Sequence, residues 1–260
     1  MLSAAQIAQY HEDGFVIPDF TIPEAVMQQL DAQVAEFLQQ HPQFRDNCGA
    51  MLRHDQSFAR FTQIPGLLDL VEQLIGPDLA LWNMSLFAKP PLDGKATPWH
   101  QDGEYWPIRP LATCTVWIAI DDAKPENGCL RVIRGSHRAR KLAAHHSNPS
   151  PDVTLHQELN SDTFDKRDAV DLVLRRGQIS LHDVYLMHGS EPNRSPRRRR
   201  GITMRLMPTT SHYSREVATQ MHSERGGNNL ADNPVLLLRG QDRCGRTQFA
   251  QLEVPSLMPA

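Results

Sequence analysis

The sequence predicts a mainly β fold, a β-sandwich or jelly roll with helices packed outside it. Helix-like segments come first, and many short segments rich in β-forming residues follow, separated by Pro, Gly, Asn and Asp. This order is typical of a sheet-based core with flanking helices. The 260 residues suffice for one substantial core. We therefore expect one domain over 1–260, with residues 1–78 mainly helical, residues 79–210 forming the barrel core and residues 211–260 closing the barrel.

Three helices are expected before the strands. Residues 3–12 form a short helix that a glycine ends. A second helix begins near Thr21, because Thr21 and Glu24 have capping-box spacing and apolar side chains then repeat at helical intervals. A third helix covers residues 65–75, and a Gly-Pro pair stops it.

Six later segments have the length and composition of strands. They cover residues 80–89, 114–121, 128–133, 170–174, 177–187 and 201–208. Residues 145–169 are polar and irregular, and a long loop of this kind in a compact domain is often a lid or a binding loop. Residues 211–233 are expected to be irregular as well.

Composition limits the partners and the compartment. The formal net charge is -3, so there is no overall basic signature for nucleic acid. No run approaches the ~18 apolar residues of a membrane helix, and the N-terminus does not resemble a signal peptide. The four cysteines form no CxxC pair, which fits reduced thiols in the cytoplasm, although export by an unusual route stays open. We expect a small-molecule substrate, no nucleic acid and no membrane, and either a monomer or a homodimer.

Three residues have the chemistry of a metal site. His100 and Asp102 are two positions apart, so on an extended strand they point to the same face. His188 follows near the end of another strand-like segment. Two imidazoles and one carboxylate suit a non-haem Fe(II) ion with open positions, whereas structural zinc usually has Cys and His ligands. Taken alone, His-x-Asp is also typical of a surface pair. His182 shares the face of His188 and is expected to be a core histidine with satisfied hydrogen bonds.

The context of these residues is far more specific than the residues themselves. The chain resembles the phytanoyl-CoA dioxygenase family of Fe(II)/2-oxoglutarate oxygenases. The resemblance spans nearly the whole chain, through WHQDGEYWPIRP (99–110), VWIAIDDAKPENGCLRVIRGSHR (116–138), GQISLHDVYLMHGSEPNRS (177–195), YHEDGFVIPDF (10–20) and PVLLLRGQD (234–242). It implies a double-stranded β-helix, a jelly-roll variant, with iron in its open mouth and with 2-oxoglutarate and O₂ as cosubstrates.

The resemblance also implies an arginine that binds the far carboxylate of 2-oxoglutarate. Its position, eleven residues after the distal histidine, is Arg199 here. A guanidinium fork matches a carboxylate in geometry. Arg200 takes this role if a bulge shifts the strand register, and Arg197 and Arg198 are expected to form a solvated basic edge. Strand alternation places Arg205 on the same face as Arg199.

Three more residues match family positions near the cosubstrate. Ser190 corresponds to a residue that assists the same carboxylate, Trp117 to a tryptophan that lines the pocket, and Lys89 to a lysine beside it. Two of them have a structural alternative, because Ser190 fits a turn and Lys89 fits a strand edge with its amine reaching solvent.

The segment after the metal pair is expected to lie over the mouth of the site. Tyr105 and Trp106 can wall an apolar or cationic substrate, and Arg109 can pair with its carboxylate or phosphate. The alternative for each is that it anchors the loop. His212 and Tyr213, in the irregular C-terminal segment, are further candidates for closing the site.

These features predict a dioxygenase that hydroxylates an aliphatic carbon of a small metabolite, an amino-acid derivative or a secondary metabolite, and releases succinate and CO₂. Asp102 favours hydroxylation or another non-halogenating oxidation, such as desaturation or ring formation, since in related halogenases a small residue replaces this carboxylate and leaves room for chloride. Three alternatives stay open. They are an acyl-CoA hydroxylase of the same family, a catalytically silent barrel that acts as a binding module, and a cupin-type metal enzyme that does not use 2-oxoglutarate.

Overall fold

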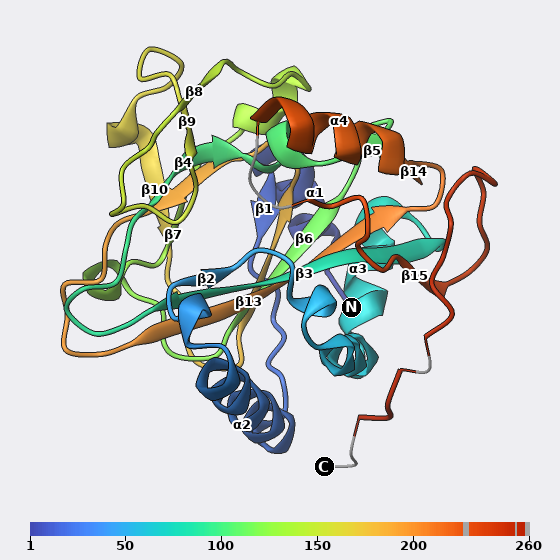
Figure 1. The fold of residues 1–260 in the computed structure, drawn as a ribbon, viewed down its shortest axis with the longest axis horizontal. Coiled ribbons are helices and arrows are strands. Elements are labelled where there is room, and N and C mark those ends of the chain that lie inside the picture. Colours follow the sequence, from blue (N-terminus) through green and yellow to red (C-terminus); the bar gives the residue numbers. More distant parts are fainter. Residues whose placement is uncertain (226–228, 253, 258–260) are drawn as a thin grey trace.

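Two antiparallel sheets form the framework of the molecule (Figure 1). The structure, a computed structural model, describes residues 1–225, 229–252 and 254–257. The strands are β1 (Phe15–Val16), β2 (Asn47–Cys48), β3 (Leu79–Lys89), β4 (Thr97–Gln101), β5 (Ile108–Arg109), β6 (Cys114–Ala119), β7 (Leu130–Ile133), β8 (His145–Ser147), β9 (Gln157–Leu159), β10 (Ala169–Leu172), β11 (Ile179–Asp183), β12 (Met187–Ser190), β13 (Arg199–Pro208), β14 (His212–Tyr213) and β15 (Leu236–Arg239).

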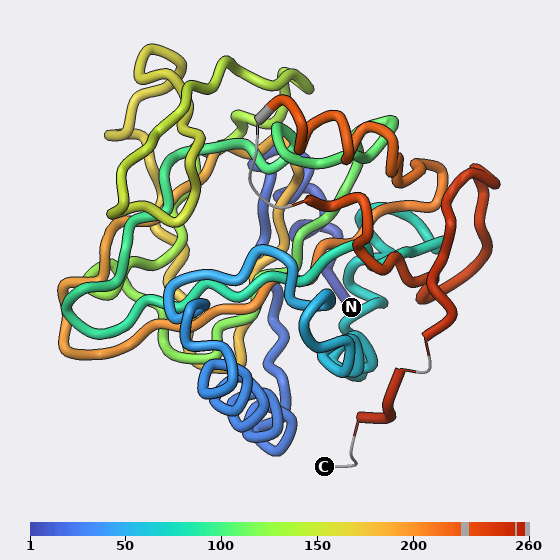
Figure 2. Tube along the Cα trace, viewed as in Figure 1, coloured from blue at the N-terminus to red at the C-terminus, as the bar shows by residue number. Residues whose placement is uncertain are grey.

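The larger sheet has the strand order β1-β11-β6-β13-β3-β15, with β2 beside β3, and the smaller sheet has the order β10-β7-β12-β4. Strands β3 and β13 pair along almost their whole lengths although more than a hundred residues separate them in sequence (Figure 2). Two further pairs, β5 with β14 and β8 with β9, lie outside these sheets. The predicted jelly-roll class is therefore confirmed, since short antiparallel strands from distant parts of the chain build both sheets.

The expected strands are observed, with one difference. The segment at 177–187 is two strands, β11 and β12, which belong to different sheets. Residues 184–186 connect them and carry the chain from the larger sheet to the smaller one. This change of sheet brings His188, on β12, opposite His100 on β4.

The helices are α1 (Ala4–Asp13), α2 (Glu24–Gln40), α3 (Leu67–Ile75) and α4 (Arg215–Arg225). Short 3-10 helices cover Pro42–Phe44, Met51–Arg53, Gln56–Gln63, Asp102–Tyr105, Pro125–Asn127, Ser136–Ala139 and Lys166–Asp168. Apolar residues of α2, α3, β6 and β13 share one buried cluster, so these helices cover the outer face of the larger sheet. In the described part of the chain, no helix is long and apolar enough to cross a membrane.

The three N-terminal helices lie where the sequence predicts them, but the predicted cap of the second helix is not observed. Helix α1 begins with a capping box of Ser3 and Gln6. Helix α2 begins at Glu24, after Pro23, without a side-chain cap. Thr21 instead forms an antiparallel bridge with Gln178. Its backbone belongs to the edge of the sheet, three residues before the helix, so the expected capping box of Thr21 and Glu24 does not form.

The C-terminal segment is more ordered than expected. Residues 211–233 were predicted to be irregular, and this is wrong because they contain β14 and α4. Helix α4 lies at the edge of the barrel that also carries the β8–β9 hairpin (Figure 1). The expected loop at 145–169 contains that hairpin, so both segments add regular structure above the same end of the barrel.

Candidate metal centre

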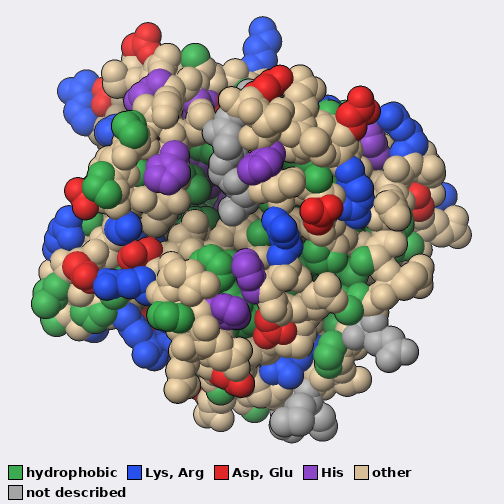
Figure 3. All heavy atoms as spheres, viewed as in Figure 1, with side chains coloured by type: hydrophobic (Ala, Val, Ile, Leu, Met, Phe, Trp, Pro, Cys, Tyr) green, Lys and Arg blue, Asp and Glu red, His purple; other side chains and the backbone are tan. Residues whose placement is uncertain are grey.

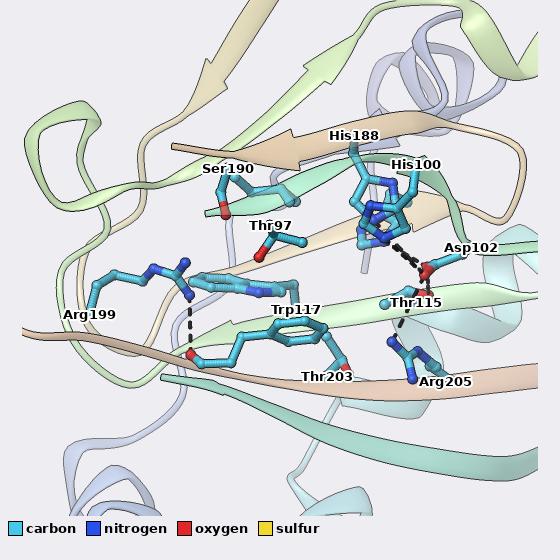
Figure 4. A pocket seen from close by; sticks show the side chains of 13 residues that line it. Thr97, His100, Asp102, Thr115, Trp117, His188, Ser190, Arg199, Thr203 and Arg205 are labelled. Atoms are coloured by element: carbon cyan, nitrogen blue, oxygen red, sulfur yellow. Dashed lines mark hydrogen bonds and ion pairs between the residues drawn. The ribbon is translucent and has the colours of Figure 1, made fainter. Parts of the chain in front are cut away.

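Three buried side chains meet between the two sheets. His100 lies on β4, Asp102 follows that strand in a 3-10 turn, and His188 lies on β12. His188 is paired directly with His100 across the smaller sheet. One ligand atom from each residue lies within 4.8 Å of the others, and all three residues are buried. Figure 4 shows both imidazoles directed toward the Asp102 carboxylate.

Backbone carbonyls fix the orientation of both imidazoles. His100 Nδ1 is 2.8 Å from the Pro98 carbonyl oxygen, and His188 Nδ1 is 2.9 Å from the Leu186 carbonyl oxygen. A carbonyl can only accept, so each Nδ1 carries the hydrogen and each Nε2 of a neutral ring presents a lone pair. The two Nε2 atoms lie 3.7 and 3.9 Å from Asp102 Oδ1. A ring nitrogen held by a carbonyl in this way, with the other nitrogen free to bind, is typical of metal-binding histidines.

The electrostatics favour the forms that bind metal. Burial raises the pKa of Asp102, but His188, His100, His182 and Arg205 outweigh burial and hold that pKa well below its usual value. Burial lowers the pKa of His188 well below its usual value, and His100 adds to the effect. An ionised carboxylate beside a neutral imidazole is the state that a divalent cation requires. The donor set fits a non-haem Fe(II) ion.

An inner pocket extends from these ligands between the sheets. Its lining comes from both sheets and comprises Phe87, Thr97, His100, Asp102, Thr115, Trp117, Leu130, His182, His188, Ser190, Arg199, Thr203 and Arg205. Arg199 lies at the end away from the metal ligands, and Thr97, Ser190 and Trp117 lie between (Figure 4). The pocket thus presents a cation and hydroxyl groups at a distance from the candidate metal.

Arg199 is 2% exposed and has no acidic partner within ion-pair distance in the described part of the chain. Its Nε donates to the Gly128 carbonyl at 3.1 Å and its Nη1 to the Phe87 carbonyl at 3.2 Å. Burial lowers the pKa of Arg199 to about 10, which still leaves it charged at neutral pH. A buried cation held only by carbonyls is a ready site for a carboxylate.

Trp117 lies beside Arg199, and a glycine makes room for it. The Arg199 guanidinium carbon is 5.6 Å from the centre of the Trp117 ring. Gly201 is paired with Ala119 on the neighbouring strand, and a Cβ on Gly201 would lie 2.1 Å from the Trp117 ring. Gly201 therefore allows the indole to lie flat against β13 and to form one wall of the inner pocket.

Of the other residues expected near the cosubstrate, one lines the inner pocket and two do not. Ser190 lines the inner pocket. Lys89 does not, because its Nζ donates to the carbonyl oxygens of Lys95 and Glu191. Arg200 faces away from the pocket and forms ion pairs with Asp121 and Asp31, both at 2.8 Å. The register of β13 therefore has no bulge at this point, and the side chains alternate as the sequence predicts.

A second, outer pocket meets the inner one at the metal ligands. The two share Phe87, His100, Asp102 and Arg205. The remaining outer lining is Asn47, Gly49, Asn83, Glu104, Tyr105, Trp106, Ser147, Thr154, Leu155, His156, Gln157, Ala218, Met221, His222 and Leu230. The β8–β9 hairpin and α4 supply much of this lining. Figure 3 shows histidine side chains at several separate places on the visible face of the molecule.

Of the expected substrate residues, two line the outer pocket and three do not. Tyr105 and Trp106 line it. Arg109 turns back and donates to the carbonyl oxygens of Trp106 and Ile108, at 3.1 and 2.7 Å. His212 contacts the Arg109 carbonyl, and the Tyr213 hydroxyl donates to the Leu230 carbonyl at 2.5 Å. The pairing of β14 with β5 holds the C-terminal segment against the turn that follows Trp106, while the Arg109 guanidinium contacts only its own turn.

The fold and the motifs agree with a match to a known family. The sequence model described as "Phytanoyl-CoA dioxygenase (PhyH)" matches residues 2–201. The chain belongs to the phytanoyl-CoA dioxygenase family. A member of the family from Bos taurus, "Phytanoyl-CoA dioxygenase, peroxisomal", is 31% identical over 166 residues, which is 62% of this chain and 49% of the relative. The chain spans about half the length of the curated relatives that it matches first.

Solved structures share the fold that this family implies. The apo form of ThoJ, described as a non-heme monooxygenase, has a TM-score of 0.74 and 25% identity over 98% of this chain and 90% of ThoJ. EctD from S. alaskensis, in a complex with 2-oxoglutarate and 5-hydroxyectoine, has a TM-score of 0.65 and 20% identity over 82% of this chain and 78% of EctD. The jelly-roll framework of the family thus covers the segments that build both pockets.

Two residues at the site, His182 and Arg205, differ from what the sequence analysis assigned to them. The expectation that His182 is a satisfied core histidine is wrong, because neither ring nitrogen has a hydrogen-bond partner among the described residues. Its Nε2 lies 3.6 Å from Asp102 Oδ2. Arg205 lines both pockets, and strand alternation from Arg199 was the signal that placed it there. The outer lining from α4 had no such signal, since that helix was not expected.

Proposed function

We propose that this chain is an Fe(II)- and 2-oxoglutarate-dependent dioxygenase that hydroxylates an aliphatic carbon of a small metabolite. The observation that carries the proposal is the position of His100, Asp102 and His188, where an inner pocket with a buried arginine meets an outer pocket with aromatic walls. In the reaction, 2-oxoglutarate is oxidised to succinate and CO₂. One atom of O₂ enters succinate and the other enters the substrate C–H bond.

The protein supplies the geometry of the metal site. His100 Nε2, Asp102 Oδ1 and His188 Nε2 would hold the ion, and Fe(II), when bound, supplies the redox chemistry that activates O₂. The Thr115 hydroxyl, 3.4 Å from Asp102 Oδ2, steadies the other carboxylate oxygen. With Oδ2 held in this way, Asp102 would present Oδ1 to the ion.

The inner pocket has the buried cation and the hydroxyl groups that 2-oxoglutarate requires. We assign the far carboxylate to Arg199, because its Nη2 has no acceptor among the described residues. The hydroxyl of Ser190 and the ring of Trp117 complete the contacts in this proposal. Lys89 acts from behind the pocket, where its amine holds two backbone carbonyls of the neighbouring turns. The complex of EctD with 2-oxoglutarate supports a cosubstrate of this kind.

The outer pocket is the proposed substrate site. Tyr105 and Trp106 wall it on the side of the metal motif, and Gln157, Ala218 and Met221 face them from the hairpin and from α4. A pocket that mixes aromatic and polar groups suits an amino-acid derivative or a secondary metabolite. The family name raises the acyl-CoA alternative, which a direct comparison of free acids with their coenzyme-A thioesters distinguishes.

The decisive experiment is 2-oxoglutarate turnover. Purified protein with Fe(II), 2-oxoglutarate and O₂ should release succinate, and a panel of small metabolites should raise the rate when a substrate is present. Asp102→Ala should abolish succinate release and the binding of Ni(II) measured by calorimetry, because the variant lacks the one charged ligand. A wild-type protein that binds neither Ni(II) nor 2-oxoglutarate would be a silent barrel, and full turnover by Asp102→Ala would remove Asp102 from the ligand set.

A further inference from the structure

Arg205 is a buried cation beside the metal centre that the proposed mechanism does not use. It lies on β13, is 8% exposed, and lines both pockets. Its Nη1 donates to the Ser85 hydroxyl at 2.7 Å. Its Nε has no hydrogen-bond partner among the described residues. Figure 4 shows its guanidinium directed from β13 toward Asp102.

Two tryptophans fix the guanidinium of Arg205 in place. Its central carbon is 4.9 Å from the Trp106 ring centre and 5.8 Å from the Trp82 ring centre. These two rings contact each other at 4.7 Å in an edge-to-face arrangement. Aromatic faces stabilise a guanidinium over its plane and leave its edge for hydrogen bonds. The site is thus preorganised for an acceptor at that edge.

The charges around Arg205 do not balance once the metal is bound. Among the described residues, the charged side chains lining the outer pocket are Asp102, Glu104 and Arg205. Asp102 Oδ1, at 3.9 Å from Arg205 Nη2, also faces both histidine Nε2 atoms and is the proposed ligand of the metal. Glu104 Oε2 lies 4.0 Å from His145 Nδ1. A desolvated cation requires a close anion, and the pocket leaves Arg205 without one at hydrogen-bond distance.

We infer that Arg205 binds a carboxylate of the primary substrate, so that the substrate is a small carboxylic acid. The inference rests on the proposed function, since it is the metal that takes up the charge of Asp102. It also limits the reaction. Because Arg205 Nη2 lies 3.9 Å from a ligand oxygen, a carboxylate bound there lies next to the metal, and the oxidised carbon is only a few bonds from that carboxylate.

The inference moves substrate recognition away from the residue that the sequence favours. Arg109 is next to the metal motif in sequence, but its guanidinium donates to two backbone carbonyls and does not line the outer pocket. Arg205 is far from the motif in sequence and reaches the metal centre from the larger sheet. Arg109 is therefore a matched control, an arginine near the same mouth with a structural role.

The test uses protein loaded with Ni(II) and saturating 2-oxoglutarate, which gives a site that does not turn over. Hexanoate and hexanamide are titrated in turn by calorimetry. Wild-type protein should bind the carboxylate about tenfold or more tightly than the amide, as expected for a charge-assisted hydrogen bond. Arg205→Gln should lose this preference, Arg205→Lys should retain part of it, and Arg109→Gln should retain all of it.

Separate outcomes contradict the inference and the proposed function. Equal affinity of wild-type protein for hexanoate and hexanamide overturns the inference, as does a preference that persists in Arg205→Gln or disappears in Arg109→Gln. If Arg205→Gln does not fold, the wild-type comparison and Arg205→Lys still decide. Failure of the wild-type protein to bind Ni(II) or 2-oxoglutarate in the loading step contradicts the proposed function instead.

Discussion

At the residue scale, two neighbouring arginines have opposite surroundings. Arg199 points into the inner pocket and contacts backbone carbonyls and Trp117. Arg200 points outward and forms two hydrogen bonds with Asp121, both at 2.8 Å. The strand places them on opposite faces, so Arg199 is available to bind a ligand while Arg200 stabilises the fold.

Substitution should separate these two roles. Arg199→Ala should raise the KM for 2-oxoglutarate about 10- to 100-fold, because the variant loses charge-assisted hydrogen bonds to the far carboxylate. Succinate release measured against 2-oxoglutarate concentration gives this value. Arg200→Ala should leave the KM within about twofold and should lower the free energy of unfolding. The reverse result would assign the carboxylate to Arg200.

Replacing His182 should increase the stability of the metal-free protein but decrease its affinity for metal. Among the described residues the buried ring nitrogens of His182 have no hydrogen-bond partner, although Nε2 lies 3.6 Å from Asp102 Oδ2, and buried groups without hydrogen bonds cost about 1–3 kcal/mol. His182→Leu should therefore stabilise the metal-free protein in urea unfolding. The same variant removes a contact of Asp102 and should weaken Ni(II) binding by about tenfold, measured by calorimetry. Unchanged Ni(II) affinity would show that His182 does not support the metal ligand.

At the element scale, the caps of α1 and α2 provide a direct comparison. Ser3 and Gln6 form both hydrogen bonds of a capping box, whereas Thr21 does not cap α2. Ser3→Ala should lower the free energy of unfolding by about 1 kcal/mol. Thr21→Ala should cost less, since it breaks no side-chain cap. Urea unfolding of the two variants measures the difference, and a larger loss for Thr21→Ala would contradict this assignment.

The elements that sequence reasoning found are those with strong periodic patterns. Helix α3 has apolar side chains on one face and a glycine-proline stop, so its limits could be predicted within two residues. Helix α4 could not, because its sequence is mostly polar and its buried Ala218 packs against the rest of the barrel. Local propensity is weak there, and tertiary contacts decide.

The site shows the same division. The grouping of His100, Asp102 and His188 could be predicted because the motifs around them resemble those of a known family, although Asp102 lies in a 3-10 turn after β4 and not on the strand itself. Arg109 and Lys89 could not be placed, since each long side chain bends back to backbone carbonyls that the sequence does not reveal. The direction of a flexible side chain depends on partners brought in by the fold.

At the scale of the whole molecule, one ion-pair cluster connects the larger sheet to α2. Arg200 on β13 bridges Asp121, which follows β6, and Asp31 on α2, both at 2.8 Å. Arg198 also contacts Asp121 at 3.3 Å. The cluster therefore joins the helical layer to the sheet on the side opposite the inner pocket. The division of the chain into one domain with three parts stays a prediction.

This cluster should make stability depend on pH in the acid range. Burial raises the pKa of Asp121, but Arg200 and Arg198 outweigh burial and lower that pKa below its usual value. A lowered carboxyl pKa adds stability above the unfolded-state pKa of about 3.9, and this stability is lost as the pH falls through the folded-state pKa.

Asp121→Asn should therefore lower the free energy of unfolding by about 1–2 kcal/mol at pH 7. The difference from wild-type protein should shrink as the pH falls below about 4. Urea unfolding at several pH values measures both effects. Asp122→Asn is the control, since Asp122 is exposed, its ion pair with Lys124 is 3.9 Å long, and an asparagine Oδ1 can still accept the hydrogen bond from the Arg176 backbone N–H. A constant difference at all pH values would show that the charge of Asp121 is not the cause.

The close approach of Gly201 to Trp117 offers a way to enlarge the inner pocket. Gly201 has no side chain, and the indole of Trp117 fills the space where a side chain at position 201 would lie. Trp117→Ala leaves an empty space beside Arg199 that a bulkier 2-oxo acid can fill, while the metal ligands stay in place. Under the proposed function, such a variant should use a bulkier cosubstrate analogue better than the wild-type protein does, so that adding the analogue would selectively start its turnover.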